Sequence, residues 1–256
     1  MKTLKDAHIL VTRPLHQADN LCQLIVNSGG IAVRFPTLEI EGVHDFLSTK
    51  AIIANLNKYQ KVVFISANAV NFALKANGGK IDNLDPTRVA AIGHATAQAL
   101  KAANLLAGCI PESGFNTEAL LAMPQMQMLR GQHCLIIRGQ GGREELADSL
   151  RNKGVNVDYW ETYKRIIPKI DISAVTSLIY QNKIDAITIT SSEALENLLT
   201  MLGKEQHQRL FCIALTVVSE RIRDCATRMG FKRIAVADNP SDSSILDTVT
   251  KLINEE

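Results

Sequence analysis

The chain has 256 residues, of which 46% are hydrophobic and 21% are charged, and its formal net charge at pH 7 is +2. These values are typical of an ordinary globular chain with room for two domains, and they argue against a disordered or fibrous protein. No block of basic residues interleaved with aromatic residues occurs, and the apolar run near the N-terminus is too short for a signal peptide or a membrane span. We therefore expect neither a nucleic acid nor a membrane as a partner.

Cysteine and histidine usage gives no sign of a metal site or a disulfide framework. The five cysteines never show CxxC spacing, each lies in an apolar strand or helix pattern, and they are Cys22, Cys109, Cys134, Cys212 and Cys225. This pattern predicts buried free thiols in a reducing compartment, hence a cytoplasmic protein. The six histidines lie far apart, and no HExxH, GxSxG or paired-carboxylate motif is present.

In the first half of the chain, short apolar strands alternate with amphipathic helices. Strands are predicted at 8–12, 31–35, 61–65, 88–93 and near 107–110, with helices between them, including one at 43–57 and one starting near Thr117. Several of these strands end at small polar residues, and at Ser66-Ala67-Asn68 the next helix is expected to start with a hydroxyl or amide N-cap.

The same pattern starts again near residue 133. HCLIIR (133–138) aligns with HILVTR (8–13), AITITSSEALENLL (186–199) with VVFISANAVNFAL (62–74), and RLFCIA (209–214) with RVAAIG (88–93). A last strand is predicted at 234–238. The offset between matched segments is about 121–125 residues, which indicates a tandem duplication.

Apolar strands that alternate with helices predict parallel sheets covered on both faces. Five strands in each half favour two flavodoxin-like α/β domains. In such sheets ligands bind outside the carboxyl ends of the strands, where helix N-termini favour anions. The candidate binding residues at these turns are Arg13, Ser66, Ala67, Asn68, Gly93, Thr96, Arg138, Gly139, Ser191, Ser192, Thr216 and Ser219. For any one turn plain helix capping is the simpler explanation, but so many turns suit a ligand with several carboxylates.

Arg13 and Arg138 occupy equivalent places at the ends of matched strands. An arginine there is able to bind a carboxylate in bidentate fashion, and a salt bridge between the two halves is the alternative. RGQGGR (138–143) is Gly-rich after a strand, but it is neither GxGxxG nor a Walker lysine loop, so a nucleotide site has little support.

Tyr163 breaks the symmetry of the duplication, because the matching position in the first half is Leu38. A phenol is able to give a proton to a leaving hydroxyl without a cofactor. A tyrosine on an interdomain strand with its hydroxyl in water is the alternative.

Taken in order, several of these motifs resemble uroporphyrinogen-III synthases. They are VTRP (11–14), ISANAV (65–70), AIGHATAQAL (91–100), RGQGGR (138–143) and the pair Tyr163 and Arg165, and they cover essentially the whole chain. The resemblance implies two α/β domains joined by a two-stranded linker, with a cleft between them. One domain combines residues 1–36 with 167–256, the other is 39–163, and the linkers are 36–40 and 163–168, each with a proline.

The resemblance also implies a reaction without a metal or organic cofactor. Linear hydroxymethylbilane loses water and closes to uroporphyrinogen III, with inversion of the terminal pyrrole ring through a spiro intermediate. Tyr163 matches the tyrosine proposed to assist departure of the hydroxyl, and Ser66, Asn68, Thr96, Ser191 and Ser192 match cleft-lining positions. The second half has Ala214 where the first has Gly93, so whether Thr216 or Ser219 faces the substrate stays open.

The expected partners are the polycarboxylate tetrapyrrole substrate and, transiently, the enzyme that supplies it, and a monomer is expected. Two alternatives remain. A two-lobed binding or regulatory domain without catalysis would have the same architecture. A nucleotide-sugar transferase is disfavoured because neither an acidic metal-binding pair nor a phosphate loop is present.

Overall fold

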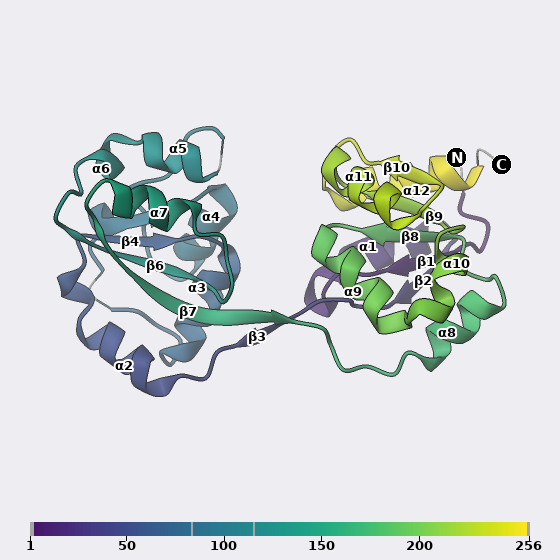
Figure 1. The fold of residues 1–256 in the computed structure, drawn as a ribbon, viewed down its shortest axis with the longest axis horizontal. Helices are drawn as coiled ribbons and strands as arrows, with labels where there is room; N and C mark the ends of the chain where they lie inside the picture. The colour runs from purple at the N-terminus through teal and green to yellow at the C-terminus, as the bar shows by residue number, and fades with distance from the viewer. Residues whose placement is uncertain (1–2, 83, 115, 255–256) are drawn as a thin grey trace. The chain divides into compact units, whose positions relative to one another are not determined.

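The computed structural model describes residues 3–82, 84–114 and 116–254, and the chain folds into two compact units (Figure 1). Unit 1 combines the residues up to Glu39 with those from Ile166 onward, and unit 2 is the continuous segment Ile40–Arg165. Each unit is built on one five-stranded sheet. The chain therefore passes from one unit to the other twice, after Glu39 and after Arg165.

Unit 1 contains the first two strands and the last three. The strands are β1 (His8–Val11), β2 (Ile31–Arg34), β8 (Ala186–Ile189), β9 (Ala214–Val217) and β10 (Ile234–Val236). The helices are α1 (Leu15–Asn27), α8 (Ser173–Tyr180), α9 (Ser192–Leu202), α10 (His207–Leu210), α11 (Glu220–Met229) and α12 (Asp242–Asn254), with a 3₁₀ turn η3 (Lys204–Gln206).

The sheet of unit 1 has the order β10-β9-β8-β1-β2, and all of its pairs are parallel. Counted within the unit this is 2-1-3-4-5, the flavodoxin order. Successive side chains of β1 point to opposite faces. Leu10 therefore packs in a core with α8, α9 and α11, while Ile9 and Val11 pack with α1 and α12.

Unit 2 contains the strands from the middle of the chain. They are β3 (Glu39–Gly42), β4 (Lys61–Phe64), β5 (Val89–Ala91), β6 (His133–Gly139) and β7 (Asn156–Ile166). The helices are α2 (Phe46–Ala54), α3 (Ala67–Ala76), α4 (His94–Ala102), α5 (Thr117–Ala122), α6 (Pro124–Gln127) and α7 (Glu145–Asn152), with 3₁₀ turns η1 (Leu56–Lys58) and η2 (Pro86–Arg88).

The sheet of unit 2 has the order β3-β7-β6-β4-β5, in which β7, β6, β4 and β5 are parallel neighbours. Beyond β5, Cys109 forms a parallel bridge with Ala90, at the place of the short strand predicted near 107–110. Val62 and Phe64 face a core with α3 and α4, and Val63 faces a core with α5, α6 and α7. The predicted α/β class with two parallel sheets is confirmed.

One predicted strand is wrong. Residues 209–214 were expected to be extended, but Leu210 ends the helix α10 and β9 begins only at Ala214. The short apolar run does not distinguish the two structures. In its helical conformation at the end of α10, Leu210 is fully buried. Phe211 packs edge-on against Phe231, with 5.2 Å between the ring centroids.

The cysteines are all free thiols, but they are not all buried as expected. Cys22, Cys109 and Cys134 are buried, Cys225 is partly exposed, and Cys212 is exposed because it lies in the turn before β9. Burial raises the pKa of the Cys134 thiol to about 12. That thiol therefore stays protonated at neutral pH and acts as a small apolar side chain.

The core of unit 2 allows a matched test of packing. Leu135 is fully buried on β6 in the same cluster as Trp160, which is the chain's single tryptophan, whereas Leu106 is 59% exposed. Leu135→Ala is expected to lower the free energy of unfolding by about 2–5 kcal/mol because it leaves a cavity. Leu106→Ala should change it by less than about 0.5 kcal/mol. Urea denaturation followed by Trp160 fluorescence measures both, and equal effects would contradict the described core.

Candidate active site

The carboxyl ends of the parallel strands of unit 2 lie along one edge of its sheet, and a cavity of about 680 Å³ lies there. Its walls come from the ends of β4, β5, β6 and β7, from the start of α5 and from the start of α7. The lining residues are Ile65, Ile92, Asn116, Thr117, Glu118, Ile136, Arg138, Gly139, Gln140, Gly142, Arg143, Glu145, Leu146, Ala147, Tyr159, Tyr163 and Arg165. This volume suits a sizeable organic ligand or part of a larger one.

Tyr163 lies in the wall of this cavity with only 3% of its surface exposed. Its hydroxyl is 3.1 Å from Oγ of Ser66, and its ring stacks on Phe72 with 5.7 Å between centroids. Ser66 Oγ also accepts a hydrogen bond from Ala69 N at 3.0 Å, as the N-cap of α3. Ser66 is therefore able to donate its own proton to the Tyr163 oxygen, which leaves the phenol proton for a ligand.

Gly139 is required by the position of the tyrosine ring. The register between β6 and β7 shifts at Arg138/Gly139, so that Gly139 pairs with Tyr163. A Cβ atom at residue 139 would lie 2.6 Å from Cε2 and Cζ of Tyr163, a distance that side chains do not tolerate. The glycine thus lets the ring lie flat against the backbone of β6.

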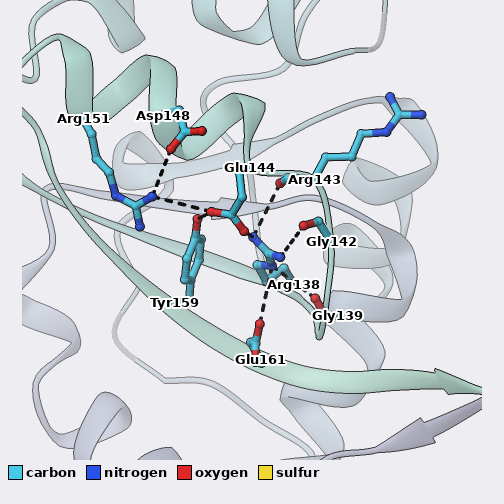
Figure 2. A network of polar contacts seen from close by, with 9 residues as sticks. All are labelled: Arg138, Gly139, Gly142, Arg143, Glu144, Asp148, Arg151, Tyr159 and Glu161. Atoms are coloured by element: carbon cyan, nitrogen blue, oxygen red, sulfur yellow. Dashed lines mark hydrogen bonds and ion pairs between the residues drawn. The ribbon is translucent and has the colours of Figure 1, made fainter.

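Arg138 is buried beneath the Gly-rich loop that follows β6, with 3% of its side chain exposed (Figure 2). Its guanidinium donates to the carbonyl oxygens of Gly139 (3.2 Å), Gly142 (2.5 Å) and Arg143 (3.5 Å). The same group forms ion pairs with Glu144 at 2.7 Å and with Glu161 at 3.7 Å.

Tyr159 completes the contacts of Arg138, whereas Arg151 is not among the residues that line the cavity. The Arg138 guanidinium lies over the Tyr159 ring at 4.5 Å, and the Tyr159 hydroxyl donates to Glu144. These hydrogen bonds, first from Tyr159 and then from Arg138, hold the pKa of Glu144 below its ordinary value. Arg151 contacts Glu144 and Asp148 at the exposed margin of the network (Figure 2).

The remaining charged groups of the cavity are mixed in sign. Arg143 is exposed, and Figure 2 shows its side chain extending away from the Arg138 network. Arg165 also lines the cavity, and Glu118 and Glu145 bring negative charge to its rim. The helix α7 begins at Glu145 without a side-chain cap, so its first N–H groups are open to an acceptor. The cavity therefore combines a phenol, arginines and backbone donors.

Of the predicted residues of unit 2, Arg138, Gly139 and Tyr163 line the cavity, and Ser66 joins them through Tyr163. The others are not among the lining residues. Ala67 and Asn68 open α3 and are partly exposed, Gly93 is the buried N-cap of α4, and Thr96 is 4% exposed in the first turn of that helix.

The predicted residues of unit 1 lie at the carboxyl ends of its own strands. Ser191 caps α9 by accepting from Ala194 N at 3.0 Å, and Ser192 is the first residue of that helix. Ser219 caps α11 by accepting from Ile222 N at 3.4 Å. Thr216 is 1% exposed inside β9, and among the described residues its hydroxyl has no hydrogen-bond partner.

Arg13 does not copy the contacts of Arg138. Its guanidinium forms an ion pair with Asp242 and donates to Pro240 O at 3.1 Å, both in the segment around the start of α12. The salt bridge that the sequence offered as an alternative therefore exists, and it joins the first and second halves of the sequence within unit 1. Asn20 donates to the same aspartate at 2.7 Å.

Several residues of the site were not singled out from the sequence. Glu144 and Tyr159 hold Arg138, and Gln140 and the start of α5 line the cavity. The one available signal was the acidic residue six positions after Arg138, across a Gly-rich loop. Within the described parts of the chain, no group of three or more histidine, cysteine or acidic side chains is placed to hold a metal ion.

Comparison with known proteins identifies the family. The family model for uroporphyrinogen-III synthase HemD matches residues 19–247. The chain is 32% identical over 242 residues to the uroporphyrinogen-III synthase of Salmonella typhimurium, and the match covers 93% of this chain and 98% of that protein. It is 30% identical over 243 residues to the Escherichia coli K12 enzyme, with the same coverage.

The chain belongs to the uroporphyrinogen-III synthase family. The predicted activity, that of a hydro-lyase of tetrapyrrole biosynthesis, is confirmed by this membership. No helix in the described ranges is both long and apolar enough to cross a bilayer.

Solved structures with the same fold support the architecture of this chain. A mutant uroporphyrinogen III synthase of Thermus thermophilus superposes with a TM-score of 0.66 at 16% identity, covering 98% of this chain and all 100% of that one. The Helicobacter pylori enzyme gives a TM-score of 0.62 at 13% identity, covering 96% and 99%. At such low identities these similarities concern the fold alone.

The ionised Glu144 carboxylate should stabilise the folded state of this chain. Its folded pKa lies below the ordinary value of 4.5, so its contribution is complete above that value and is lost as the pH falls through the folded pKa. Glu144→Gln removes the charge that faces Arg138, Arg151 and Tyr159. The difference in unfolding free energy between wild type and Glu144→Gln is therefore expected to shrink from about pH 6 to about pH 3.

Urea denaturation at several pH values measures this difference. Glu145→Gln is the control for the loss of a neighbouring carboxylate, because Glu145 forms none of the ion pairs found among the described residues. If the difference in unfolding free energy between wild type and Glu144→Gln did not change with pH, the result would contradict the ion pair.

Proposed function

We propose that the cavity of unit 2 is where hydroxymethylbilane loses its hydroxyl group on the way to uroporphyrinogen III. The observation that carries the proposal is the Tyr163 phenol, buried in the cavity wall and held by Ser66 at 3.1 Å. In the proposal Ser66, the N-cap of α3, donates to the phenol oxygen, so the phenol proton is directed elsewhere, and a leaving hydroxyl is a suitable acceptor.

In this mechanism Tyr163 gives its proton to the hydroxyl oxygen of the substrate, the carbon–oxygen bond breaks and water leaves. The resulting cation is attacked by the substituted carbon of the terminal pyrrole ring, which forms the spiro intermediate, and rearrangement then inverts that ring. The proton released when the ring system regains aromaticity replaces the one that Tyr163 gave. No electron donor or acceptor is needed, in line with the expectation of no cofactor.

The rest of the cavity would orient the substrate rather than react with it. Arg143, Arg165 and the open N–H groups at the start of α7 suit the acetate and propionate groups of a polyacid. Holding these groups restricts how the chain of pyrroles closes, and such positioning is a large source of rate enhancement. Unguided closure would give the isomer without ring inversion.

The polar turns of unit 1 are proposed as further binding positions for carboxylates. Ser191, Ser192 and Ser219 are partly exposed at helix N-termini, and Ser219 rather than the buried Thr216 is the side chain able to reach a ligand at its turn. Transient contact with the supplying enzyme, a monomeric state and a cytoplasmic location stay predictions from the sequence.

The isomer ratio of the product tests the function directly. Freshly generated hydroxymethylbilane is incubated with the protein, the product is oxidised to porphyrin, and the type I and type III isomers are separated by chromatography. Predominantly type III product is expected, because the enzyme enforces ring inversion. Product of type I alone, equal to the spontaneous reaction, would refute the activity and leave a binding or regulatory domain.

Tyr163→Phe tests the role of the phenol. Turnover is expected to fall by about tenfold to a hundredfold, the usual share of one general acid, while the product stays type III because orientation is retained. Tyr180→Phe is the matched control, since Tyr180 is 66% exposed on α8 and belongs to unit 1. An unchanged rate for Tyr163→Phe would remove the phenol from the mechanism.

A further inference from the structure

We propose that Arg138 is a positioning residue for substrate binding: it holds the carbonyl groups of the Gly139–Glu144 loop inward, so that the loop's N–H groups and the Arg143 side chain receive a carboxylate of the substrate. The proposal rests on the function proposed above. It assigns to Arg138 an indirect role, in contrast to the direct carboxylate contact that its position at a strand end suggested.

The contacts of the guanidinium carry this assignment. Nε, Nη1 and Nη2 donate to three carbonyl groups of the loop, and Nη1 also donates to Glu144. These bonds use nearly all the N–H donors of an arginine. Because the side chain is 97% buried and nearly all of its donors are engaged, a substrate carboxylate has little access to it.

The loop itself is left with unused donors. Within the described ranges, the backbone N–H groups of Gly141, Gly142 and Arg143 donate to no protein acceptor, while the carbonyls of Gly142 and Arg143 are bound by Arg138. Gly142 and Arg143 line the cavity. Successive N–H groups exposed in a turn form a concave site for an anion, and fixing their carbonyls beforehand lowers the entropic cost of binding.

This arrangement is not a general requirement of the fold. Arg13 occupies the equivalent position in unit 1, yet it contacts Asp242 and Pro240 O in a distant segment and organises no loop of its own. Arg151 shares Glu144 and Tyr159 with Arg138 but is 42% exposed and bonds to none of the loop carbonyls. Of these three arginines, Arg138 alone holds the loop carbonyls, and it lies in the unit that contains Tyr163.

Arg138→Lys, with Arg151→Lys as the matched control, separates positioning from charge. Lysine keeps the positive charge, but one ammonium group cannot bridge three carbonyls and a carboxylate. We expect Arg138→Lys to raise KM for hydroxymethylbilane by about tenfold with kcat within about twofold, because the loop binds ground state and transition state alike. Arg151→Lys should leave both constants within about twofold of wild type.

Hydrogen exchange of the ligand-free protein provides a readout independent of activity. The Gln140 amide donates to Tyr163 O at 2.8 Å and reports on the start of the loop. Its exchange rate is expected to rise at least about tenfold in Arg138→Lys and to stay unchanged in Arg151→Lys. Faster exchange without a change in KM would mean a purely structural role and overturn the proposal. A higher KM without faster exchange would mean direct contact with the substrate and also overturn it.

Gly142→Ala is a second variant that disturbs the contact between Arg138 and the loop, and it serves if Arg138→Lys does not fold. A Cβ at residue 142 would lie 3.2–3.3 Å from the guanidinium atoms and displace them slightly, so a smaller rise in KM is expected. An unchanged KM with a displaced loop would contradict the proposal.

A stable porphyrin separates the failure of this proposal from failure of the proposed function. If the wild type makes only type I product, the function fails, and binding of uroporphyrin III by fluorescence quenching then decides the role of the loop. Weaker binding to Arg138→Lys by about tenfold, with unchanged binding to Arg151→Lys, would support the positioning role. Equal binding to both variants would overturn it.

Discussion

The buried guanidinium of Arg138 is the contact on which the polar edge of unit 2 depends. A buried cation is costly unless it is paired and hydrogen-bonded, and this one is held by loop carbonyls, by Glu144 and by Glu161. Glu161 lies on β7, two residues before Tyr163. Arg138 therefore ties the loop that follows β6 to the strand that carries the phenol, and one side chain fixes both walls of the cavity.

The phenol is positioned by a second, purely steric constraint. Tyr163 lies flat against Gly139, stacks on Phe72 and meets the capping Ser66 with its hydroxyl. The backbone of Gly139, the ring of Phe72 and the hydroxyl of Ser66 each restrict the rotation of the Tyr163 side chain, so its rotamer is set before a ligand binds. A group held in this way loses little entropy in the reaction, which is the condition for efficient proton transfer at a fixed site.

The sequence predicts the repeated strand, turn and helix well, because an apolar strand followed by a capping residue is a local signal. Ser66 and Ser191 were both expected as caps, and both cap their helices. Partners of the arginines were not predictable in the same way. The acceptor of Arg13, Asp242, is 229 positions away, and only the folded sheet brings them together. The strand predicted at 209–214 failed because packing, not propensity, decides a short apolar run.

The duplication shows which part of the site is specialised. Three pairs of residues lie 125 positions apart in the sequence: Ser66 with Ser191, Gly139 with Pro14, and Tyr163 with Leu38. The serines keep the same capping role in both units, so capping alone belongs to the shared scaffold. Unit 1 has neither the phenol nor the glycine. The ring of Tyr163 lies where a Cβ atom at residue 139 would clash with it, so the tyrosine requires the glycine. Unit 1 has Leu38 in place of the tyrosine and Pro14 in place of the glycine.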